Sequence, residues 1–317
     1  MYDIIGDIHG YAEPLKKLLE KLGYAESRGS WHHPVNKVIF VGDYIDRGPA
    51  IRETLQIVKG MTDSSNAIAL MGNHELNALA YHCKVDGFPL RRHTEKNTKQ
   101  HEHTLEQFFG HEAEWQMYLQ WFYTLPLFFE DDGIRAVHAC WDEDHIQWLK
   151  DNCKPIAFPF QNRVYYKYVM NAELLKTSHN RQSQAYHVIN DTLKGKEFNI
   201  PGQYEWADRE GLVRKSNRVK WWVDPRANVY EEWLFDCPIE MKTLTIDEGY
   251  QPYVYPSYAP PVFFGHYWLE DSYPVVQEKN IVCLDYSIAN KGCLVAYRWV
   301  AEREPGINNF VKVRYKE

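Results

Sequence analysis

Five short apolar runs in this chain each end in a residue type that can bind a metal ion. The runs and the residues that follow them are 2–6 with Asp7 and His9, 38–42 with Asp43, 67–72 with Asn73, 134–137 with His138, and 262–265 with His266. Short apolar runs bounded by turn residues are typical of buried strands, and ligands in α/β sheets gather outside the carboxyl ends of the strands. The pattern therefore predicts one pocket at one edge of a sheet.

The ligand types in these runs indicate a site for two metal ions. The carboxylate of Asp43 has two oxygens and can bridge two cations, while Gly6 and Gly10 permit the tight turn that would aim Asp7 and His9 at one ion. Mixed nitrogen and oxygen ligands suit Mn, Fe, Zn or Ni. Each residue alone has an ordinary alternative, such as a helix cap for Asp43, so the prediction depends on their joint occurrence.

The first 82 residues alternate between strand and helix patterns. Strands are predicted at 2–7, 37–43 and 67–72, and helices at 11–22, 51–61 and 75–82. Such alternation predicts parallel strands with right-handed crossovers. Later strands are predicted at 127–139, 261–265, 280–285 and 292–300. Together these elements predict an α/β fold.

Two stretches break this alternation. Residues 145–258 are rich in Tyr, Trp, Asn and Pro, and we predict a single domain over 1–317 in which 145–258 is an insertion that decorates the core, with helical patterns at 142–151 and 165–194. Residues 91–104 are polar, which predicts a solvent-exposed loop. The nearby histidines are therefore expected to face solvent rather than to bind metal; they are His93, His101, His103 and His111.

Composition excludes several classes of protein. A net charge of −7 argues against general nucleic-acid binding, which needs a basic face. No stretch is apolar for long enough to span a membrane, and no signal-peptide pattern begins the chain. Six cysteines without CxxC spacing predict reduced thiols and a cytoplasmic location.

Three of the motifs carry a resemblance to a known family. They are GDIHG at 6–10, GDYIDRG at 42–48 and GNHE at 72–75. In this order they resemble the signature blocks of the calcineurin-like metallophosphoesterases, and the GDxxDRG form resembles the phosphoprotein phosphatase branch, which includes bacterial diadenosine tetraphosphatases. The resemblance covers about 1–140 and 260–300. It implies a metallophosphoesterase-like β-sandwich flanked by helices.

The resemblance also implies a ligand set. Asp7, His9 and Asp43 would hold the first ion, and Asp43, Asn73, His138 and His266 the second. Two departures concern the metal identity: Cys140 stands where the family usually has Gly, and Trp268 stands two residues after His266, where many relatives have a second His. We expect two divalent or trivalent ions, with Mn²⁺ first and Fe, Zn or Ni as alternatives.

A pair of ions about 3.5–4 Å apart can clamp a phosphoryl group and lower the pKa of a bridging water from about 15.7 to about 7, which yields an attacking hydroxide. His74, next to Asn73, is the predicted general acid, and Asp46 is predicted to fix its tautomer by a hydrogen bond. Arg47 is predicted to grip phosphate oxygens. The family resemblance implies the same three roles. Glu75 is expected to open the following helix.

Three functions fit these residues. The first is hydrolysis of phosphomonoesters, phosphoproteins included; the second is hydrolysis of dinucleoside polyphosphates; the third is a catalytically silent metal-binding scaffold. A nuclease is a weaker fourth. The substrate would be a phosphorylated small molecule, a nucleotide or a phosphoprotein.

Residues outside the motifs add candidates for substrate binding. The candidate phosphate-binding arginines of the insertion are Arg163, Arg181, Arg214 and Arg218. Trp221 and Trp222 would either stack a nucleobase or fill the core, and the core is favoured. Asp285 would either support the site or cap a turn, and the turn is favoured.

Overall fold

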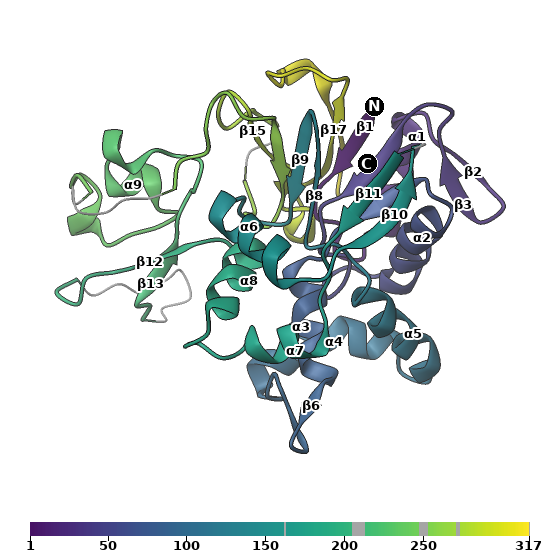
Figure 1. Ribbon diagram of the computed structural model, residues 1–317, viewed down its shortest axis with the longest axis horizontal. Coiled ribbons are helices and arrows are strands. Elements are labelled where there is room, and N and C mark those ends of the chain that lie inside the picture. Colours follow the sequence, from purple (N-terminus) through teal and green to yellow (C-terminus); the bar gives the residue numbers. More distant parts are fainter. Residues whose placement is uncertain (162, 205–212, 247–252, 271–272, 317) are drawn as a thin grey trace.

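Two β-sheets form the centre of the protein in a computed structural model that describes residues 1–161, 163–204, 213–246, 253–270 and 273–316 (Figure 1). The larger sheet has the order β16-β17-β1-β4-β5, with β18 paired to β17. Its strands are β1 (Tyr2–Ile5), β4 (Lys37–Phe40), β5 (Ala67–Ala69), β16 (Asp285–Tyr286), β17 (Cys293–Trp299) and β18 (Phe310–Arg314). The smaller sheet has the order β15-β14-β9-β8. Its strands are β8 (Phe128–Asp131), β9 (Ile134–Val137), β14 (Val262–Phe264) and β15 (Ile281–Cys283).

The strands that carry the motifs run in parallel within each sheet. In the larger sheet β4 pairs in parallel with both β1 and β5, as the alternation predicted. In the smaller sheet β14 pairs in parallel with both β9 and β15. The carboxyl ends of β1, β4 and β5 therefore lie at one edge of the larger sheet, and those of β9 and β14 lie at one edge of the smaller sheet.

Both faces of these strands are buried. Ile4 and Phe263 belong to an apolar cluster between the two sheets, whereas their neighbours Ile5 and Phe264 belong to a second cluster that also contains Leu15 of the first helix. Because successive strand residues point to opposite faces, burial of both faces requires an unbroken apolar run. This explains why the strands are visible in the sequence as continuous runs rather than as alternating patterns.

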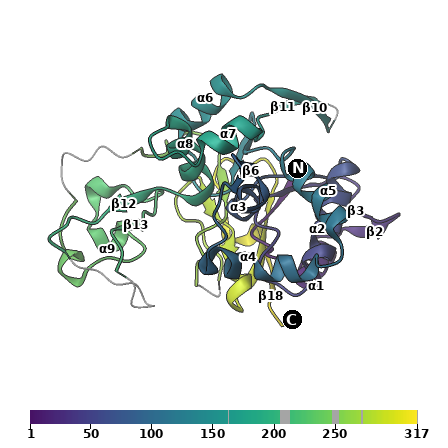
Figure 2. The ribbon, with the colours of Figure 1, turned by 90° about the horizontal axis from the view of Figure 1, so that it is seen from below.

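Helices flank the sandwich, except for α9 (Tyr230–Trp233), which lies in a segment that projects from it (Figures 1 and 2). The flanking helices are α1 (Ala12–Lys21), α2 (Ile51–Asp63), α3 (Asn73–His82), α4 (Glu95–Gln107), α5 (Glu112–Phe122), α6 (Glu143–Asn152), α7 (Ala172–Thr177) and α8 (Gln184–Lys194). Short 3₁₀ turns are η1 (Pro225–Ala227), η2 (Ile239–Met241), η3 (Ile288–Asn290) and η4 (Ile307–Asn309). Helix α1 contacts β17 and β18, and α2 contacts β5. The predicted β-sandwich flanked by helices is confirmed. Within the described ranges, every helix is too short or too polar to cross a lipid bilayer.

Short hairpins extend from this core. They are β2 (Ala25–Ser27) with β3 (Ser30–His32), β6 (Lys84–Val85) with β7 (Phe88–Pro89), β10 (Ile156–Phe160) with β11 (Arg163–Lys167), and β12 (Glu197–Asn199) with β13 (Ser216–Arg218). The segment with β12, β13 and α9 projects away from the sandwich in both views (Figures 1 and 2). It belongs to the stretch 145–258, of which 205–212 and 247–252 lie outside the described residues. Its role as an insertion stays a prediction.

The prediction of a solvent-exposed loop at 91–104 is wrong. Most of this stretch belongs to α4, which Thr94 caps by accepting the N–H of Asn97 at 3.3 Å. The helix was missed because its inward side carries the buried polar residues His101 and Thr104 instead of an apolar stripe. Apolar periodicity, the main sequence signal for a helix, is therefore absent there.

The prediction of a helix over 165–194 is also partly wrong. Its first residues belong to β11, and the helical part is divided into α7 and α8. Asn171 and Ser183 begin these two helices, because their side chains accept the N–H groups of Leu174 and Tyr186. The two caps explain the break that the helical pattern alone did not show.

A buried ion pair joins the first strand to the last part of the chain. Asp3 is fully buried, and it accepts hydrogen bonds from Arg298 Nε at 2.7 Å, from Tyr24 Oη at 3.0 Å and from Asn36 Nδ2 at 3.0 Å. Arg298 faces Asp3 across the antiparallel pair of β1 and β17. Since an unpaired buried charge is costly, this pair holds the two strands in register.

We therefore expect Arg298→Met to lower the free energy of unfolding by about 3 kcal/mol, because it leaves the Asp3 carboxylate buried without its cation. Urea denaturation followed by circular dichroism measures this change. The exposed Arg303 offers a matched control, and Arg303→Met is expected to change stability by less than about 0.5 kcal/mol. Similar losses in both variants would contradict the role of the buried pair.

Candidate metal centre

The predicted ligands meet at one edge of the sandwich and are all buried. They are Asp7, His9, Asp43, Asn73, His138 and His266, with between 0% and 9% of each residue exposed. Backbone hydrogen bonds join their loops: the N–H groups of Ile8 and His9 donate to the carbonyl of Asp43, and the N–H of Gly265 donates to the carbonyl of His138. The strand ends of both sheets therefore contribute to a single site.

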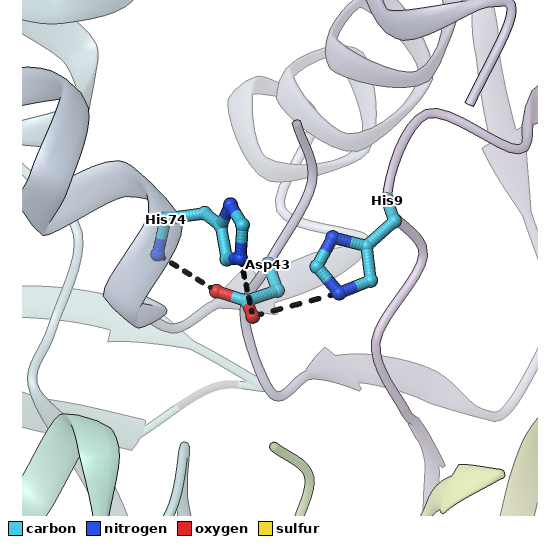
Figure 3. Close-up of side chains that lie close together, drawn as sticks. All are labelled: His9, Asp43 and His74. Atoms are coloured by element: carbon cyan, nitrogen blue, oxygen red, sulfur yellow. Dashed lines mark hydrogen bonds and ion pairs between the residues drawn. The ribbon is translucent and has the colours of Figure 1, made fainter. Parts of the chain in front are cut away.

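The carboxylate of Asp43 lies at the centre of this site (Figure 3). Its Oδ2 atom is 3.7 Å from Nε2 of His9 and 3.9 Å from Nε2 of His74. Its Oδ1 atom is 3.4 Å from Nε2 of His138 and accepts the backbone N–H of His74 at 3.0 Å. The two oxygens thus face different histidines, which is the arrangement that a carboxylate bridging two ions requires.

Among the residues that the structure describes, two groups of side chains are close enough to hold an ion, and both contain Asp43. One comprises His9, Asp43 and His74, and the other comprises Asp43, His138 and His266; within each group the ligand atoms lie within 4.8 Å of one another. The second group agrees with the predicted ligands. The first differs from the prediction, because it contains His74, the expected general acid, and does not contain Asp7.

Asp7 lies beside the second group. Its Oδ2 atom accepts the backbone N–H of His266 at 2.9 Å. Its Oδ1 atom and Nε2 of His9 are buried, and neither has a hydrogen-bond partner among the described residues. Buried polar atoms are almost always paired, so these two atoms fit the position of metal ligands.

The tautomers of two histidines also fit metal binding. Nδ1 of His9 lies 3.0 Å from the carbonyl oxygen of Ile45, and Nδ1 of His138 lies 2.9 Å from that of Val41. A carbonyl oxygen only accepts, so each Nδ1 carries a hydrogen, and each Nε2 is the ring nitrogen on the side of Asp43. Metal-binding histidines are typically oriented by a hydrogen bond of this kind.

The backbone at the site is held in a sparsely populated conformation. His9, Asp43, Asp46 and His266 have φ values of 51°, 54°, 81° and 72°. Left-handed backbone is unfavourable for residues with a side chain and is found preferentially at functional sites. The turns at the strand ends therefore orient these side chains toward the site. The cost in backbone free energy is offset by contacts with the surrounding residues.

Two glycines leave room for the carboxylates. A Cβ atom on Gly72 would overlap Oδ1 and the backbone nitrogen of Asp43, and one on Gly265 would overlap Oδ1 of Asp7. Glu75 holds the same turn, since it accepts the N–H groups of Gly72, Asp43 and Tyr44 at 2.9–3.0 Å. The sequence analysis assigned Glu75 only to the start of α3 and missed this contact.

Burial and charge shift the protonation of the site. Burial raises the pKa of Asp7, and the charges of Asp285 and Asp43 raise it further. Burial also lowers the pKa of His9 to about 4, and burial with the charge of Asp43 raises the pKa of Glu75 to about 7. Burial would raise the pKa of Asp43, but the imidazoles of His138 and His74 outweigh it and hold this pKa well below its usual range. Several carboxylates thus share a buried site, and bound cations would offset their repulsion.

His74, Asp46 and Arg47 lie next to the ligand groups. Nδ1 of His74 is 2.7 Å from Oδ2 of Asp46, the hydrogen bond that the motif spacing predicted. The Arg47 guanidinium lies 5.5 Å from the ring centroid of Trp268, and its buried Nε has no hydrogen-bond partner within the described ranges. Trp268 is half-buried, and its ring centroid is 6.3 Å from that of His9.

The pKa values of His74 and Asp46 are shifted by the charged groups around them. Burial would lower the pKa of His74, but the charges of Asp43 and Asp46 outweigh it and raise this pKa. Burial would raise the pKa of Asp46, but His101 and His74 outweigh it and lower that pKa. The two carboxylates therefore favour a protonated His74, and the two imidazoles favour an ionised Asp46.

The structure places the candidate phosphate-binding arginines of the insertion in different surroundings. Nη1 of Arg218 lies 3.2 Å from Nε2 of His266, so this arginine reaches the site. Arg163 instead pairs with Asp131 at 3.2 Å, at the end of the β8–β9 hairpin opposite His138. Arg181 is exposed, and Arg214 is half-buried and lies just before β13.

Trp221 and Trp222 are core residues, as favoured from the sequence. They are buried, with 4% and 9% exposed, and both pack against Phe264. Asp285 supports the loop after His266, because its carboxylate accepts the backbone N–H groups of Trp268 at 2.7 Å and Ser287 at 3.0 Å. Asp285 therefore combines the supporting and the turn-capping role.

A small polar cavity of about 50 Å³ borders His74 and Asp46. Its lining residues include Asn77 of α3, Gln100 of α4 and Arg91 between them, and Arg91 donates hydrogen bonds to Asn77 and Gln100. The cavity gives a substrate polar surroundings on the side of His74.

Comparisons with known proteins agree with the motifs. The family model described as calcineurin-like phosphoesterase matches residues 2–266. A relative from Halalkalibacterium halodurans, named bis(5'-nucleosyl)-tetraphosphatase PrpE (asymmetrical), is 45% identical over 74 residues, 23% of this chain and 30% of the relative. The matches to this and two further PrpE relatives span 29–30% of those proteins.

Two other comparisons extend over most of the chain. A protein from Vibrio parahaemolyticus, named bis(5'-nucleosyl)-tetraphosphatase, symmetrical, is 24% identical over 93% of this chain and 94% of its own length. A solved serine/threonine phosphatase from Saccharomyces cerevisiae, described as similar to human PP5, is 13% identical over 99% of this chain and 78% of its own, with a TM-score of 0.47.

The contact of Gly72 with Asp43 can be tested by Gly72→Ala. The added methyl group would displace the Asp43 carboxylate, so we expect the affinity for Mn²⁺ to fall roughly 10-fold or more, as measured by calorimetric titration of metal-free protein. Gly202→Ala is the control, because a Cβ atom on Gly202 would meet nothing within 4 Å. Unchanged affinity in a folded Gly72→Ala protein would show that Asp43 does not hold the ions.

Proposed function

Because the chain belongs to the calcineurin-like phosphoesterase family, we propose that it is a metal-dependent phosphoesterase whose reaction takes place around Asp43. The observation that carries the proposal is the shared position of Asp43 in two ligand groups, next to the hydrogen-bonded pair of His74 and Asp46. A silent scaffold would not require this acid pair, so its presence favours an enzyme.

The proposed ligands would hold two divalent ions. Asp7, His9, Asp43, Asn73, His138 and His266 are assigned to them, with Mn²⁺ as the first choice over Fe, Zn or Ni. When bound, such ions lower the pKa of a water molecule and neutralise charge on phosphate oxygens. Nε2 of His266 lies within reach of Arg218, and its single lone pair cannot serve both an ion and this arginine.

The side chains around the ligands supply the remaining steps. His74 donates a proton to the leaving oxygen from Nε2, because its Nδ1 is bonded to Asp46. Arg47 and Arg218 flank the site from the larger sheet and from β13, and each presents a planar set of donors suited to phosphate oxygens. The small polar cavity beside His74 would admit water or a small polar part of the leaving group.

Two substrate classes remain in competition. Phosphomonoesters, phosphoproteins included, need only the ions, the two arginines and His74. Dinucleoside polyphosphates are the second candidate, and the relative of that activity that matches 93% of this chain supports them. Trp268, beside Arg47, is the half-buried aromatic residue suited to stack a base in that case. We propose a cytoplasmic location on the basis of the unpaired cysteines.

His74→Asn tests the proton donor. We expect kcat to fall by about 10²-fold or more, because the leaving group is no longer protonated, while the metal content stays unchanged. Steady-state kinetics and elemental analysis of the same preparation measure both quantities. Parallel loss of metal and rate would assign His74 to the ligands instead, as its place in the first group allows.

A substrate panel separates the two classes. With metal-free protein reloaded with Mn²⁺, we expect hydrolysis of p-nitrophenyl phosphate and of a phosphopeptide, and no hydrolysis without metal. A higher kcat/KM for diadenosine tetraphosphate than for either would establish the second candidate, and Trp268→Leu would then lower that value roughly 10-fold through lost stacking. If none of the three is hydrolysed by protein with bound metal, the enzyme proposal is wrong.

A further inference from the structure

Helix α4 turns a polar stripe toward the loop that follows Asp43. The stripe consists of His101, Thr104 and Gln107, which lie three residues apart and so share one side of the helix. Gln107 donates to the carbonyl of Gly48 at 3.0 Å and accepts the N–H of Ile51 at 2.7 Å. These bonds fasten the end of the loop to the helix.

Thr104 binds Asp46 twice. Its hydroxyl donates to Oδ1 of Asp46 at 2.6 Å and accepts the backbone N–H of the same residue at 3.1 Å. Asp46 has a φ of 81°, and a side chain in left-handed backbone needs such outside contacts to stay in place. Thr104 therefore fixes both the backbone and the carboxylate of Asp46.

His101 binds the same carboxylate oxygen. Nδ1 of His101 is 2.6 Å from Oδ1 of Asp46, and since an ionised carboxylate only accepts, the ring nitrogen donates. The other oxygen, Oδ2, lies 2.7 Å from Nδ1 of His74. One carboxylate thus joins two imidazoles, one beside the proposed metal ligands and one on α4.

Contacts on the side of the ring that faces away from Asp46 also hold His101 in place. Its Nε2 atom lies 3.3 Å from Nε2 of His82, and that nitrogen of His82 accepts the indole N–H of Trp115 at 3.0 Å. The ring packs against those of Tyr81 and Trp115 at centroid distances of 5.2 and 5.7 Å. His101 is 4% exposed, so its orientation is set by packing rather than by solvent.

We propose that His101 is a positioning residue for His74, acting through the carboxylate of Asp46; the catalytic consequence rests on the proposed function. With Oδ1 held by His101 and Thr104, the carboxylate is oriented so that Oδ2 meets His74. The imidazole then keeps Nδ1 protonated and presents Nε2 toward Asp43. Removal of His101 frees the carboxylate to rotate, and His74 loses its fixed orientation.

The kinetic test compares two leaving groups. Protonation by His74 matters more for phenyl phosphate, which has the poorer leaving group, than for p-nitrophenyl phosphate. We therefore expect His101→Ala to lower kcat for phenyl phosphate by roughly 10- to 100-fold, with a smaller loss for p-nitrophenyl phosphate and little change in KM or metal content. In His101→Asn the amide nitrogen replaces Nδ1 as donor, so most of the rate is expected to return.

His103 provides the control within the same helix. Its side chain is 54% exposed, so His103→Ala removes an imidazole from α4 without touching Asp46 and should behave as the wild type. Equal losses for both substrates in His101→Ala, or loss of bound metal, would overturn the proposal by showing a structural role alone. Unchanged kinetics would overturn it as well.

A spectroscopic test does not depend on activity. The Nδ1 proton shared by His74 and Asp46 should give a downfield proton NMR signal that His74→Asn removes. We expect this signal to be lost or broadened in His101→Ala and kept in His103→Ala and His101→Asn. If the wild type hydrolyses no phosphoester, the proposed function fails, and this signal alone decides whether His101 positions His74; its persistence in His101→Ala overturns the proposal.

Discussion

The buried carboxylate of Asp43 is the group on which the rest of the site depends. Its left-handed backbone is held by Glu75, which accepts the N–H groups of Asp43 and Tyr44, and its side chain occupies the space that Gly72 leaves. One oxygen then faces His9 and the other faces His138. Both ligand groups can share Asp43 only because these contacts fix it between them, and the negative charge collected there makes cation binding favourable.

The sequence predicted the ligands better than their surroundings. Asp43 and His266 were identifiable because each directly follows an apolar run, and parallel strands bring such ends together. His101 was assigned to a solvent-exposed loop, since the stripe of α4 that faces the site is polar and gives no apolar period. Its contact with Asp46 depends on tertiary packing, and the spacing of 55 residues carries no sign of it. A polar i, i+3, i+6 pattern is the one signal that was present.

The proposed site draws its residues from two parts of the chain. The proposed metal ligands follow the motif-bearing strands, whereas Arg218 comes from β13 in the projecting segment (Figure 1) and lies next to His266. Trp268 stands where the family resemblance would imply another histidine, and its ring lies 5.5 Å from the Arg47 guanidinium. The proposed reaction and the choice of substrate would thus depend on separate elements, so one can change while the other is kept.

The chain passes from one sheet to the other next to the site. β15 ends at Cys283 and β16 begins at Asp285, so only Leu284 separates the two sheets there. His9 and Asp43 follow strands of the larger sheet, whereas His138 and His266 follow strands of the smaller one. The apolar layer between the sheets, which contains Leu284, therefore acts as a spacer that sets how far apart the two halves of the centre stand. Because such layers are close-packed and barely compressible, a change in their thickness would alter the distance between the halves before any ligand is replaced.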